Sequence, residues 1–233
     1  MPDGAVLSDL HLFSRRSEGT KVENALCSYG DDLSFLVLNG DILDFRWSTF
    51  ETEENTIKAG ISWLQALGER FPDCHVYYVM GNHDCTAGWG EALDRLSSER
   101  FSWSPTHFIL GDSLFLHGDL PLEGKEPFHR PLQQEHRRMP AYGAMDLLYH
   151  GLIKARAHKI PCSLFSGSYC APKILNNLRL HEPDILPGLQ HIYFGHTHSP
   201  FRGHMHEGIA FHNTGSAVRY MDFNSMSVAV RDV

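Results

Sequence analysis

The chain has 233 residues, of which 42% are hydrophobic and 11% aromatic, enough for one large domain or one domain with an insertion. Asp and Glu total 28 against 20 Lys and Arg, and the formal charge of −8 argues against the broad basic surface of a nucleic-acid-binding protein. No segment approaches the roughly 20 consecutive apolar residues of a membrane span. The first residues lack the basic and apolar regions of a signal peptide, so we expect a cytoplasmic protein with reduced cysteines.

The first half of the chain alternates strand-like and helix-like stretches, which is typical of an α/β fold. Apolar runs predict strands, and apolar residues spaced near 3.6 predict amphipathic helices. We expect strands over residues 5–8, 35–39 and 75–80, and helices over residues 21–32, 52–70 and 89–100.

From Phe101 the pattern changes to shorter strands. Residues 119–190 then form a long interval, rich in Pro, Arg, His and aromatic residues, with a helical segment around residues 142–157. We interpret this interval as a helical cap over an active site. An ordinary pair of sheet-packing helices with a solvated charge cluster remains an open alternative. The expected strands of this half cover residues 106–110, 113–116, 209–212 and 226–230.

Five short clusters of Asp, Asn and His each follow an apolar run. Open α/β sheets bind ligands at the carboxyl ends of their strands, where such clusters would meet. Carboxylate, amide and imidazole groups, with positions left open for water, are what a hydrolytic metal site needs. The clusters are Asp9 with His11, Asp41 with Asp44, Asn82 with His83 and Asp84, His117 with Asp119, and His196 with His198.

This ordered set resembles the calcineurin-like metallophosphoesterases. The blocks D-x-H, G-D-x-x-D, G-N-H-D, His and G-H-x-H all occur in order across residues 9–198, and the turn at residues 213–216 is also similar. Any single block would be weak evidence, whereas five in order are specific. The resemblance implies an αββα four-layer sandwich of two mixed sheets flanked by helices. It would form one domain over residues 1–233, with residues 119–190 as a helical cap insertion.

The resemblance also implies a binuclear metal centre. A bridging carboxylate would hold two cations about 3.5–4 Å apart, and a metal-bridging hydroxide would attack the phosphorus. Nitrogen and oxygen ligands without thiolate favour two divalent transition metal ions, with Mn expected and Fe, Zn or Co as alternatives. By matching positions, one metal would take Asp9, His11 and His198, the other Asn82, His117 and His196, with Asp41 bridging both.

His83 follows Asn82 and matches the family's histidine that assists the leaving group or stabilises the phosphoryl oxygens. Asp84 is expected to hold the imidazole of His83 in one tautomer, as carboxylates behind catalytic histidines commonly do. Asp44 and Asp119 are expected to support the ligands or their turns rather than to bind metal.

Two further groups of residues are candidates for substrate binding. Arg46 and Trp47 follow the Asp41 block, and a guanidinium beside an exposed aromatic suits a substrate with a phosphate and a ring. The alternative that Trp47 only covers the sheet edge remains open. Lys154 and Arg156 belong to a basic run after the helical segment, which would suit an amphiphile bearing acyl chains and a phosphate.

Within the family, the chain most resembles the UDP-2,3-diacylglucosamine hydrolases, in length, in the insertion before the last block and in the His-Gly-Asp at residues 117–119. It departs from them at His83, where those enzymes carry arginine, and at residues 47–49, where they carry a longer acidic run. The resemblance implies hydrolysis of a phosphate ester or pyrophosphate bond in a phosphorylated small molecule or a nucleotide-linked lipid.

Two alternatives to a lipid hydrolase remain. One is a generic phosphodiesterase or phosphomonoesterase acting on a small soluble substrate. The other is a non-catalytic scaffold on the same fold, which is disfavoured because all seven ligand positions and His83 are retained. A lipid substrate would bring the protein into peripheral contact with the membrane, and no nucleic-acid partner is expected.

Overall fold

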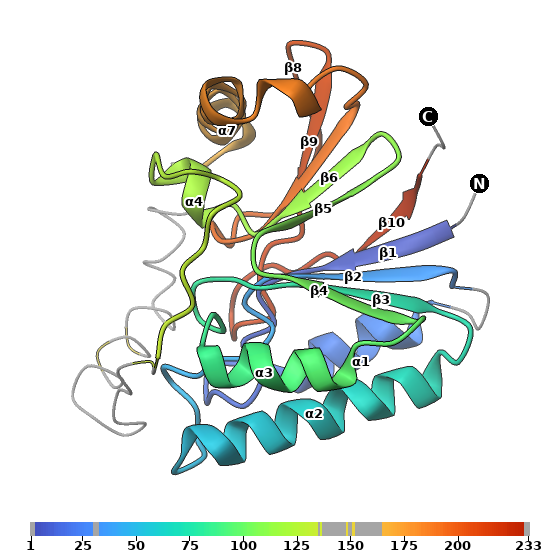
Figure 1. The fold of residues 1–233 in the computed structure, drawn as a ribbon, viewed down its shortest axis with the longest axis vertical. Coiled ribbons are helices and arrows are strands. Elements are labelled where there is room, and N and C mark those ends of the chain that lie inside the picture. Colours follow the sequence, from blue (N-terminus) through green and yellow to red (C-terminus); the bar gives the residue numbers. More distant parts are fainter. Residues whose placement is uncertain are drawn as a thin grey trace.

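The computed structural model describes residues 3–29, 33–134, 136, 148, 151 and 165–230. Two five-stranded sheets face each other (Figure 1), with strand orders β10-β1-β2-β3-β4 and β5-β6-β7-β9-β8. The first sheet contains β1 (Asp3–Leu7), β2 (Phe35–Asn39), β3 (His75–Val79), β4 (Phe101–Ser104) and β10 (Met226–Ala229). The second contains β5 (His107–Leu110), β6 (Ser113–Leu116), β7 (His191–Phe194), β8 (Phe201–His206) and β9 (Ile209–Asn213).

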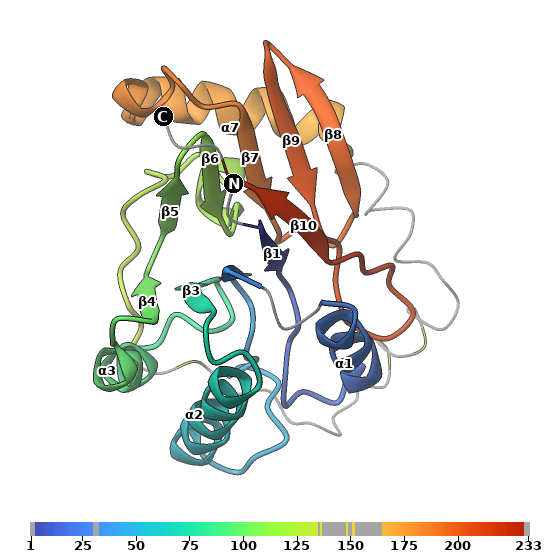
Figure 2. The ribbon, with the colours of Figure 1, turned by 90° about the vertical axis from the view of Figure 1, so that its right-hand side faces the viewer.

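Helices cover the outer face of each sheet (Figures 1 and 2). The first sheet is covered by α1 (Gly19–Cys27), α2 (Glu53–Arg70) and α3 (Ala87–Leu96). The second is covered by α7 (Gly167–His181), with the short α4 (Asp119–Leu122) and the 3₁₀ turn η1 (Pro183–Ile185) beside it. The predicted αββα sandwich of two mixed sheets is therefore confirmed. Within the described residues, none of the helices is both long and apolar enough to cross a membrane.

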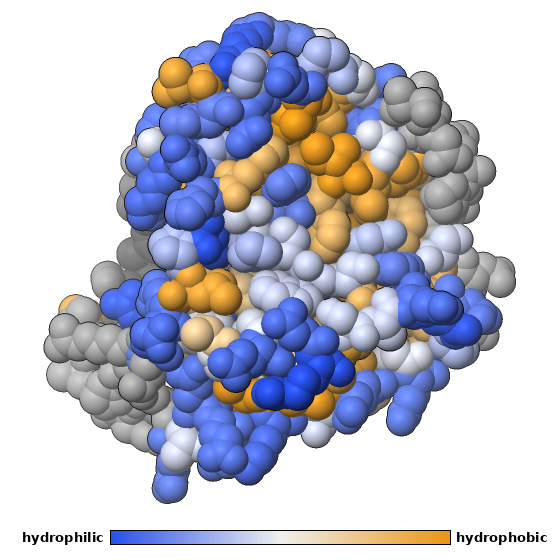
Figure 3. Space-filling view, in the orientation of Figure 1, coloured by the Kyte–Doolittle hydropathy of each residue, from blue (hydrophilic) through white to orange (hydrophobic). Residues whose placement is uncertain are grey.

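The central strands β2, β6 and β9 are buried along their whole length, which explains their continuous apolar runs in the sequence. Inside the sandwich, Val6 and Val37 of the first sheet pack with Phe115 and Tyr193 of the second. Outside it, Trp89 of α3 joins the core under the first sheet. In Figure 3 apolar side chains gather over β5 and β6, where Ile109 is 41% exposed, and polar side chains predominate over α2.

Strand direction brings the polar clusters to one end of the sandwich. In the first sheet β1, β2 and β3 run parallel, and in the second β6, β7 and β9 run parallel. Asn39, the last residue of β2, joins the two sheets there, because its side-chain amide donates to the carbonyls of Leu116 (3.0 Å) and Tyr193 (3.1 Å). The loops that follow these strands therefore meet between the sheets.

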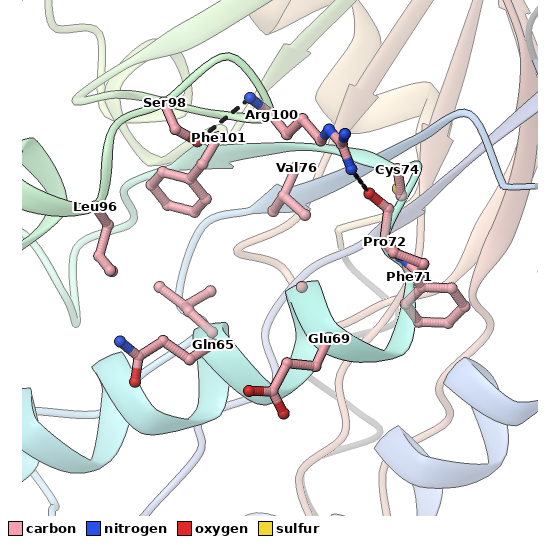
Figure 4. A pocket seen from close by; sticks show the side chains of 12 residues that line it. Gln65, Glu69, Phe71, Pro72, Cys74, Val76, Leu96, Ser98, Arg100 and Phe101 are labelled. Carbon is pink, nitrogen blue, oxygen red and sulfur yellow. Dashed lines mark hydrogen bonds between the residues drawn. The ribbon is translucent and has the colours of Figure 1, made fainter.

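A pocket of about 600 Å³ lies at the opposite end of the first sheet, where β3 and β4 begin (Figure 4). Phe71, Val76 and Phe101 give it an apolar lining, and Arg100 reaches across to the carbonyl oxygen of Pro72. The pocket is separated from the polar clusters by the length of the strands.

Several element boundaries differ from the sequence-based expectation. The first helix begins at Gly19 and ends at Cys27, short of the predicted residue 32. α3 ends at Leu96 rather than at residue 100, because Ser98 and Phe101 form a backbone bridge that turns the chain into β4. β4 and β8 are strands that the sequence pattern did not reveal.

The predicted cap over residues 119–190 is described only in part. The expected helical segment at residues 142–157 lies outside the described residues, apart from positions 148 and 151. At the end of the interval, Cys170, Ile174 and Leu178 of α7 are buried against the second sheet. The cap itself stays a prediction.

Candidate metal centre

The predicted ligands lie together at the carboxyl ends of five strands. Four of them are almost fully buried: Asp9, His11, Asp41 and His117 are at most 4% exposed. Asp9 and His11 follow β1, Asp41 follows β2, Asn82 follows β3, His117 follows β6, and His196 and His198 follow β7.

The first group of ligands consists of Asp9, His11 and His198. Nε2 of His198 lies 3.1 Å from Oδ1 of Asp9 and 3.2 Å from Nε2 of His11. One donor atom from each of the three residues lies within 4.8 Å of the others. This spacing is suitable for three ligands of one cation.

The second group forms around the amide oxygen of Asn82. Its Oδ1 lies 3.2 Å from Nε2 of His117 and 3.0 Å from Nδ1 of His196. Asp41 lies between the two groups, because its Oδ2 is 3.3 Å from Nε2 of His117 and 3.9 Å from Nε2 of His11. Buried carboxylate oxygens and imidazole nitrogens converging in this way fit a pair of divalent cations that share Asp41.

The backbone at these ligands is strained. Left-handed φ angles are uncommon for residues other than glycine and cost on the order of 1–3 kcal/mol each, and they cluster at functional sites. Left-handed conformations occur at five of the seven predicted ligands: Asp9 (53°), His11 (48°), Asp41 (52°), His196 (64°) and His198 (55°). The fold thus holds the side chains in place at the expense of backbone strain.

Two motif glycines make room for the carboxylates. A Cβ at Gly81 would overlap Oδ1 of Asp41, and a Cβ at Gly195 would overlap Oδ2 of Asp9. Any side chain at either position would therefore displace a predicted metal ligand. This explains why glycine precedes Asn82 and His196 in the two blocks.

His83 is oriented by a residue other than the expected one. Its Nδ1 lies 3.0 Å from Oδ1 of Asp44, and its backbone N–H donates to Oδ1 of Asp41 at 2.8 Å. Asp84, expected to hold the tautomer of His83, is turned the other way. It accepts hydrogen bonds from the backbone of Gly81 (2.6 Å) and the hydroxyl of Tyr78 (2.7 Å). The predicted role of Asp84 is therefore wrong, because the turn directs its carboxylate back under β3, and Asp44 takes that place.

Electrostatic interactions within the cluster keep its carboxylates ionised. Burial alone would raise the pKa of Asp41, but His117 and His83 hold it well below its usual range. Burial would lower the pKa of His83, but Asp41 and Asp44 raise it to about 9. By contrast, burial and the charge of Asp41 raise the pKa of Asp84 to about 6. The ionised carboxylates are the form that binds cations.

Comparison with known families gives a match to calcineurin-like phosphoesterase over residues 5–200. The chain belongs to this family. Among solved structures, a dimetal phosphatase from Danio rerio is similar over 98% of this chain and 99% of that chain, with 13% sequence identity and a TM-score of 0.46. No curated protein matches the chain. The protein is thus a metal-dependent phosphoester hydrolase with a dinuclear divalent metal site.

Of the candidate substrate residues of this phosphoesterase, the structure describes only Arg46 and Trp47. Arg46 is exposed, while Trp47 is half-buried with the guanidinium of Arg16 lying 3.7 Å from its ring centre. The backbone N–H of Trp47 donates to Asp44, so the loop that carries it is fixed to the partner of His83. Lys154 and Arg156 lie outside the described residues.

One close neighbour of the ligands could not be predicted from the sequence. Sδ of Met221 lies 3.2 Å from Nδ1 of His198, on the side of the ring opposite Asp9. A methionine 23 positions after His198 belongs to no recognisable block. Arg16 was missed for the same reason.

Proposed function

We propose that this phosphoesterase hydrolyses a pyrophosphate bond in a nucleotide-linked lipid of the UDP-2,3-diacylglucosamine type, with two Mn²⁺ ions as cofactors. The observation that carries the catalytic part is the pair of ligand groups that share Asp41, with His83 beside them and bonded to Asp44. The lipid part rests on the resemblance of the sequence to that subgroup. We also propose that the protein is cytoplasmic, and a lipid substrate would bring it into peripheral contact with the membrane.

In this mechanism the protein holds the reacting groups in fixed positions. When bound, the two divalent ions supply an activated water and neutralise charge on the phosphoryl oxygens. Asp41 holds the two ligand groups together, and the neutral amide of Asn82 limits negative charge near an anionic substrate. Because Nδ1 of His83 is bonded to Asp44, the imidazolium can donate from Nε2 to the leaving oxygen.

Recognition of the rest of the substrate is assigned to residues around the metal centre. A pocket of about 440 Å³ opens beside Asn82, and in its wall Lys125 pairs with Glu123 and Arg130 with Asp119. Arg130 is held by a bidentate bond to Asp119, with nitrogen–oxygen distances of 2.8 and 2.5 Å. Arg46 and Trp47 would contact a phosphate and the sugar ring of the substrate, and Lys154 and Arg156 of the cap would contact the lipid portion.

An activity panel with added Mn²⁺ tests this proposal. It compares p-nitrophenyl phosphate, bis-p-nitrophenyl phosphate and UDP-2,3-diacylglucosamine, with Asp41→Asn as the inactive control. We expect kcat/KM to be highest for the UDP-linked lipid. Equal or lower kcat/KM for the lipid than for the diester would overturn the lipid assignment and leave the phosphoesterase reaction in place.

A generic activity on a small soluble phosphodiester is the second candidate. It is favoured by His83 and by residues 47–49, where the chain departs from the lipid hydrolases. Preference for bis-p-nitrophenyl phosphate over both other substrates would support it.

A further inference from the structure

Tyr220 combines an exposed ring with a strained backbone. Its side chain is 54% exposed, and its φ of 65° lies in the left-handed region, which an aromatic residue rarely adopts. Apart from the five predicted ligands, left-handed non-glycine residues in the described part of the chain are Phe13, Glu207 and Tyr220. Strain of this kind persists only where surrounding contacts enforce it, and it concentrates at functional sites.

The contacts that enforce this conformation come from Lys21. Its ammonium group donates to the carbonyl oxygens of Val218 (3.0 Å) and Met221 (2.8 Å), which flank the strained position. Glu18 pairs with the same ammonium at 3.0 Å, and Ser17 bridges to Val218 through the backbone. The turn is therefore fixed to the start of α1.

The same turn is attached at both ends to predicted metal ligands. At its start, the hydroxyl of Ser216 and the backbone N–H of Ala217 donate to the carbonyl of Asp9, at 2.9 and 3.1 Å. At its end, Sδ of Met221 lies 3.2 Å from Nδ1 of His198. The turn is therefore anchored to two of the predicted metal ligands, Asp9 and His198.

A groove of about 630 Å³ runs along the turn. Its lining is mainly polar and includes Thr20, Lys21, Arg219, Tyr220 and Asp222. Met221 also lines it and so forms the wall between the groove and His198. The groove thus offers an aromatic face, hydrogen-bonding groups for the edge of a ring, and a position next to the phosphoryl site.

We propose that this groove is a subsite for a planar heteroaromatic ring of the substrate, which stacks on Tyr220 while its phosphate occupies the metal centre. The inference rests on the proposed function, in which the substrate carries a nucleotide. Lys21 is a positioning residue in this scheme, because it holds the turn that presents the ring of Tyr220.

Two product-like inhibitors that differ only in the base test the subsite. Uridine 5′-monophosphate and ribose 5-phosphate are compared as inhibitors of Mn²⁺-dependent hydrolysis of bis-p-nitrophenyl phosphate. We expect Tyr220→Ala to raise the Ki of uridine 5′-monophosphate about 10-fold, as for loss of one base–aromatic stack, and the Ki of ribose 5-phosphate less than about 2-fold. Tyr220→Phe keeps the aromatic face and should retain the wild-type ratio of the two Ki values.

Two further variants separate stacking from general effects. Lys21→Met should raise the ratio of the Ki of uridine 5′-monophosphate to that of ribose 5-phosphate, as Tyr220→Ala does, because the turn loses its clamp. Tyr169→Ala, at a 42% exposed tyrosine on α7, is the matched control and should leave the ratio unchanged. The proposal is overturned if Tyr220→Ala leaves both Ki values unchanged or raises them equally. Failure to hydrolyse the UDP-linked lipid would count against the proposed function alone, because the Ki comparison uses a different substrate.

Discussion

Oδ1 of Asp44 lies 3.0 Å from Nδ1 of His83, and this contact joins the loop after β2 to the loop after β3. The other carboxylate oxygen of Asp44 lies 3.4 Å from Nδ1 of His11. One buried carboxylate therefore contacts both the predicted leaving-group histidine and a predicted metal ligand. Such outer carboxylates orient imidazoles and stabilise their charged form.

Asp44→Asn should consequently slow the reaction while the protein keeps its metals. The amide can still accept a hydrogen bond, but it lacks the charge that stabilises the imidazolium of His83. We expect kcat to fall about 10–100-fold, the usual effect of losing such a partner. Steady-state kinetics beside elemental analysis of the purified variant would measure both quantities.

Asp84→Asn is the comparison for Asp44→Asn. Asp84 bonds Gly81 and Tyr78 rather than His83, so its loss should mainly lower the melting temperature. A larger fall in kcat for Asp84→Asn than for Asp44→Asn, at temperatures where both are folded, would restore the role first predicted for Asp84.

Asp41→Asn should be more damaging than His83→Ala, and in a different way. Asp41 lies between the two ligand groups, and without its charge the pair of cations should be lost. His83→Ala should retain the metals and lower kcat by roughly 10²–10⁴-fold, as expected for a general acid. Metal content per chain distinguishes the cases. Metal loss in His83→Ala, or full occupancy in Asp41→Asn, would contradict the assignment.

Removal of metal should lower both activity and stability. Asp9 and Asp41 are 0% and 1% exposed and lie in one cluster, so cations that bind only the folded state stabilise it. Saturation at 100 times Kd contributes about 2.7 kcal/mol to the free energy of unfolding. Chelation should abolish hydrolysis and lower Tm, and Mn²⁺ should restore both. Full activity in a preparation verified as metal-free would refute a binuclear centre.

The ligand cluster could be predicted because each ligand block is recognisable from the residues next to it in the chain. Each polar block directly follows an apolar run, and parallel strands bring such blocks to one edge whatever lies between them. The direction in which each side chain points was harder to predict from the sequence. Asp84 adjoins His83 in the sequence, whereas Asp44 lies 39 positions away, so adjacency favoured Asp84 as the partner of His83. Only the turn at Gly81 decides that Asp84 points away.

Elements without a strong periodic signal were missed. β4, over Phe101–Ser104, is only partly buried. The polar stretch before it was expected to continue the helix, but a backbone bridge between Ser98 and Phe101 reverses the chain there. β8 is an edge strand with polar and charged residues. Tyr220 and Met221 belong to a turn that brings Met221 against His198. The residue types in this turn do not predict its backbone conformation, in which Tyr220 has a left-handed φ.

His212 should make the protein sensitive to mild acid. It is 6% exposed, and its Nδ1 accepts a hydrogen bond from the backbone of Gly203 at 3.2 Å, which requires the neutral ring. Burial, with His191 and Arg202 nearby, lowers its pKa to about 4 from the usual 6.5. The unfolded chain therefore binds the proton first. The stability from neutral His212 is present above about pH 6.5 and is lost as the pH falls towards 4.

The comparison is between the wild type and His212→Asn, whose amide oxygen can still accept the bond from Gly203. Urea unfolding at pH 7.5 and pH 5 gives the free energy of unfolding of each protein. We expect the wild type to lose about 2 kcal/mol more than the variant over this interval. Equal losses would show that His212 does not carry the acid sensitivity.

The cap prediction concerns residues outside the described part of the chain. Lys154, Arg156 and Lys159 form a basic run after a segment with an apolar face, which would suit the phosphate and acyl chains of a nucleotide-linked lipid. Replacing all three with glutamine should raise KM for UDP-2,3-diacylglucosamine and barely change turnover of p-nitrophenyl phosphate. Remote binding energy affects only substrates that reach the residues supplying it.

Removing the same number of charges elsewhere provides the control for that triple variant. Lys58, Arg95 and Arg202 are exposed on α2, α3 and β8, outside residues 119–190, and their replacement with glutamine changes the net charge equally. If the control raises KM for the lipid as much as the cap variant does, the effect comes from overall charge. If the cap variant slows both substrates equally, the interval is structural and a small soluble phosphoester becomes the better substrate assignment. Recognition by residues 119–190 is supported only if the cap variant, and not the control variant, loses activity on the lipid while it keeps its activity on p-nitrophenyl phosphate. A defect in folding would reduce activity on both substrates, and an effect of overall charge would appear in both variants.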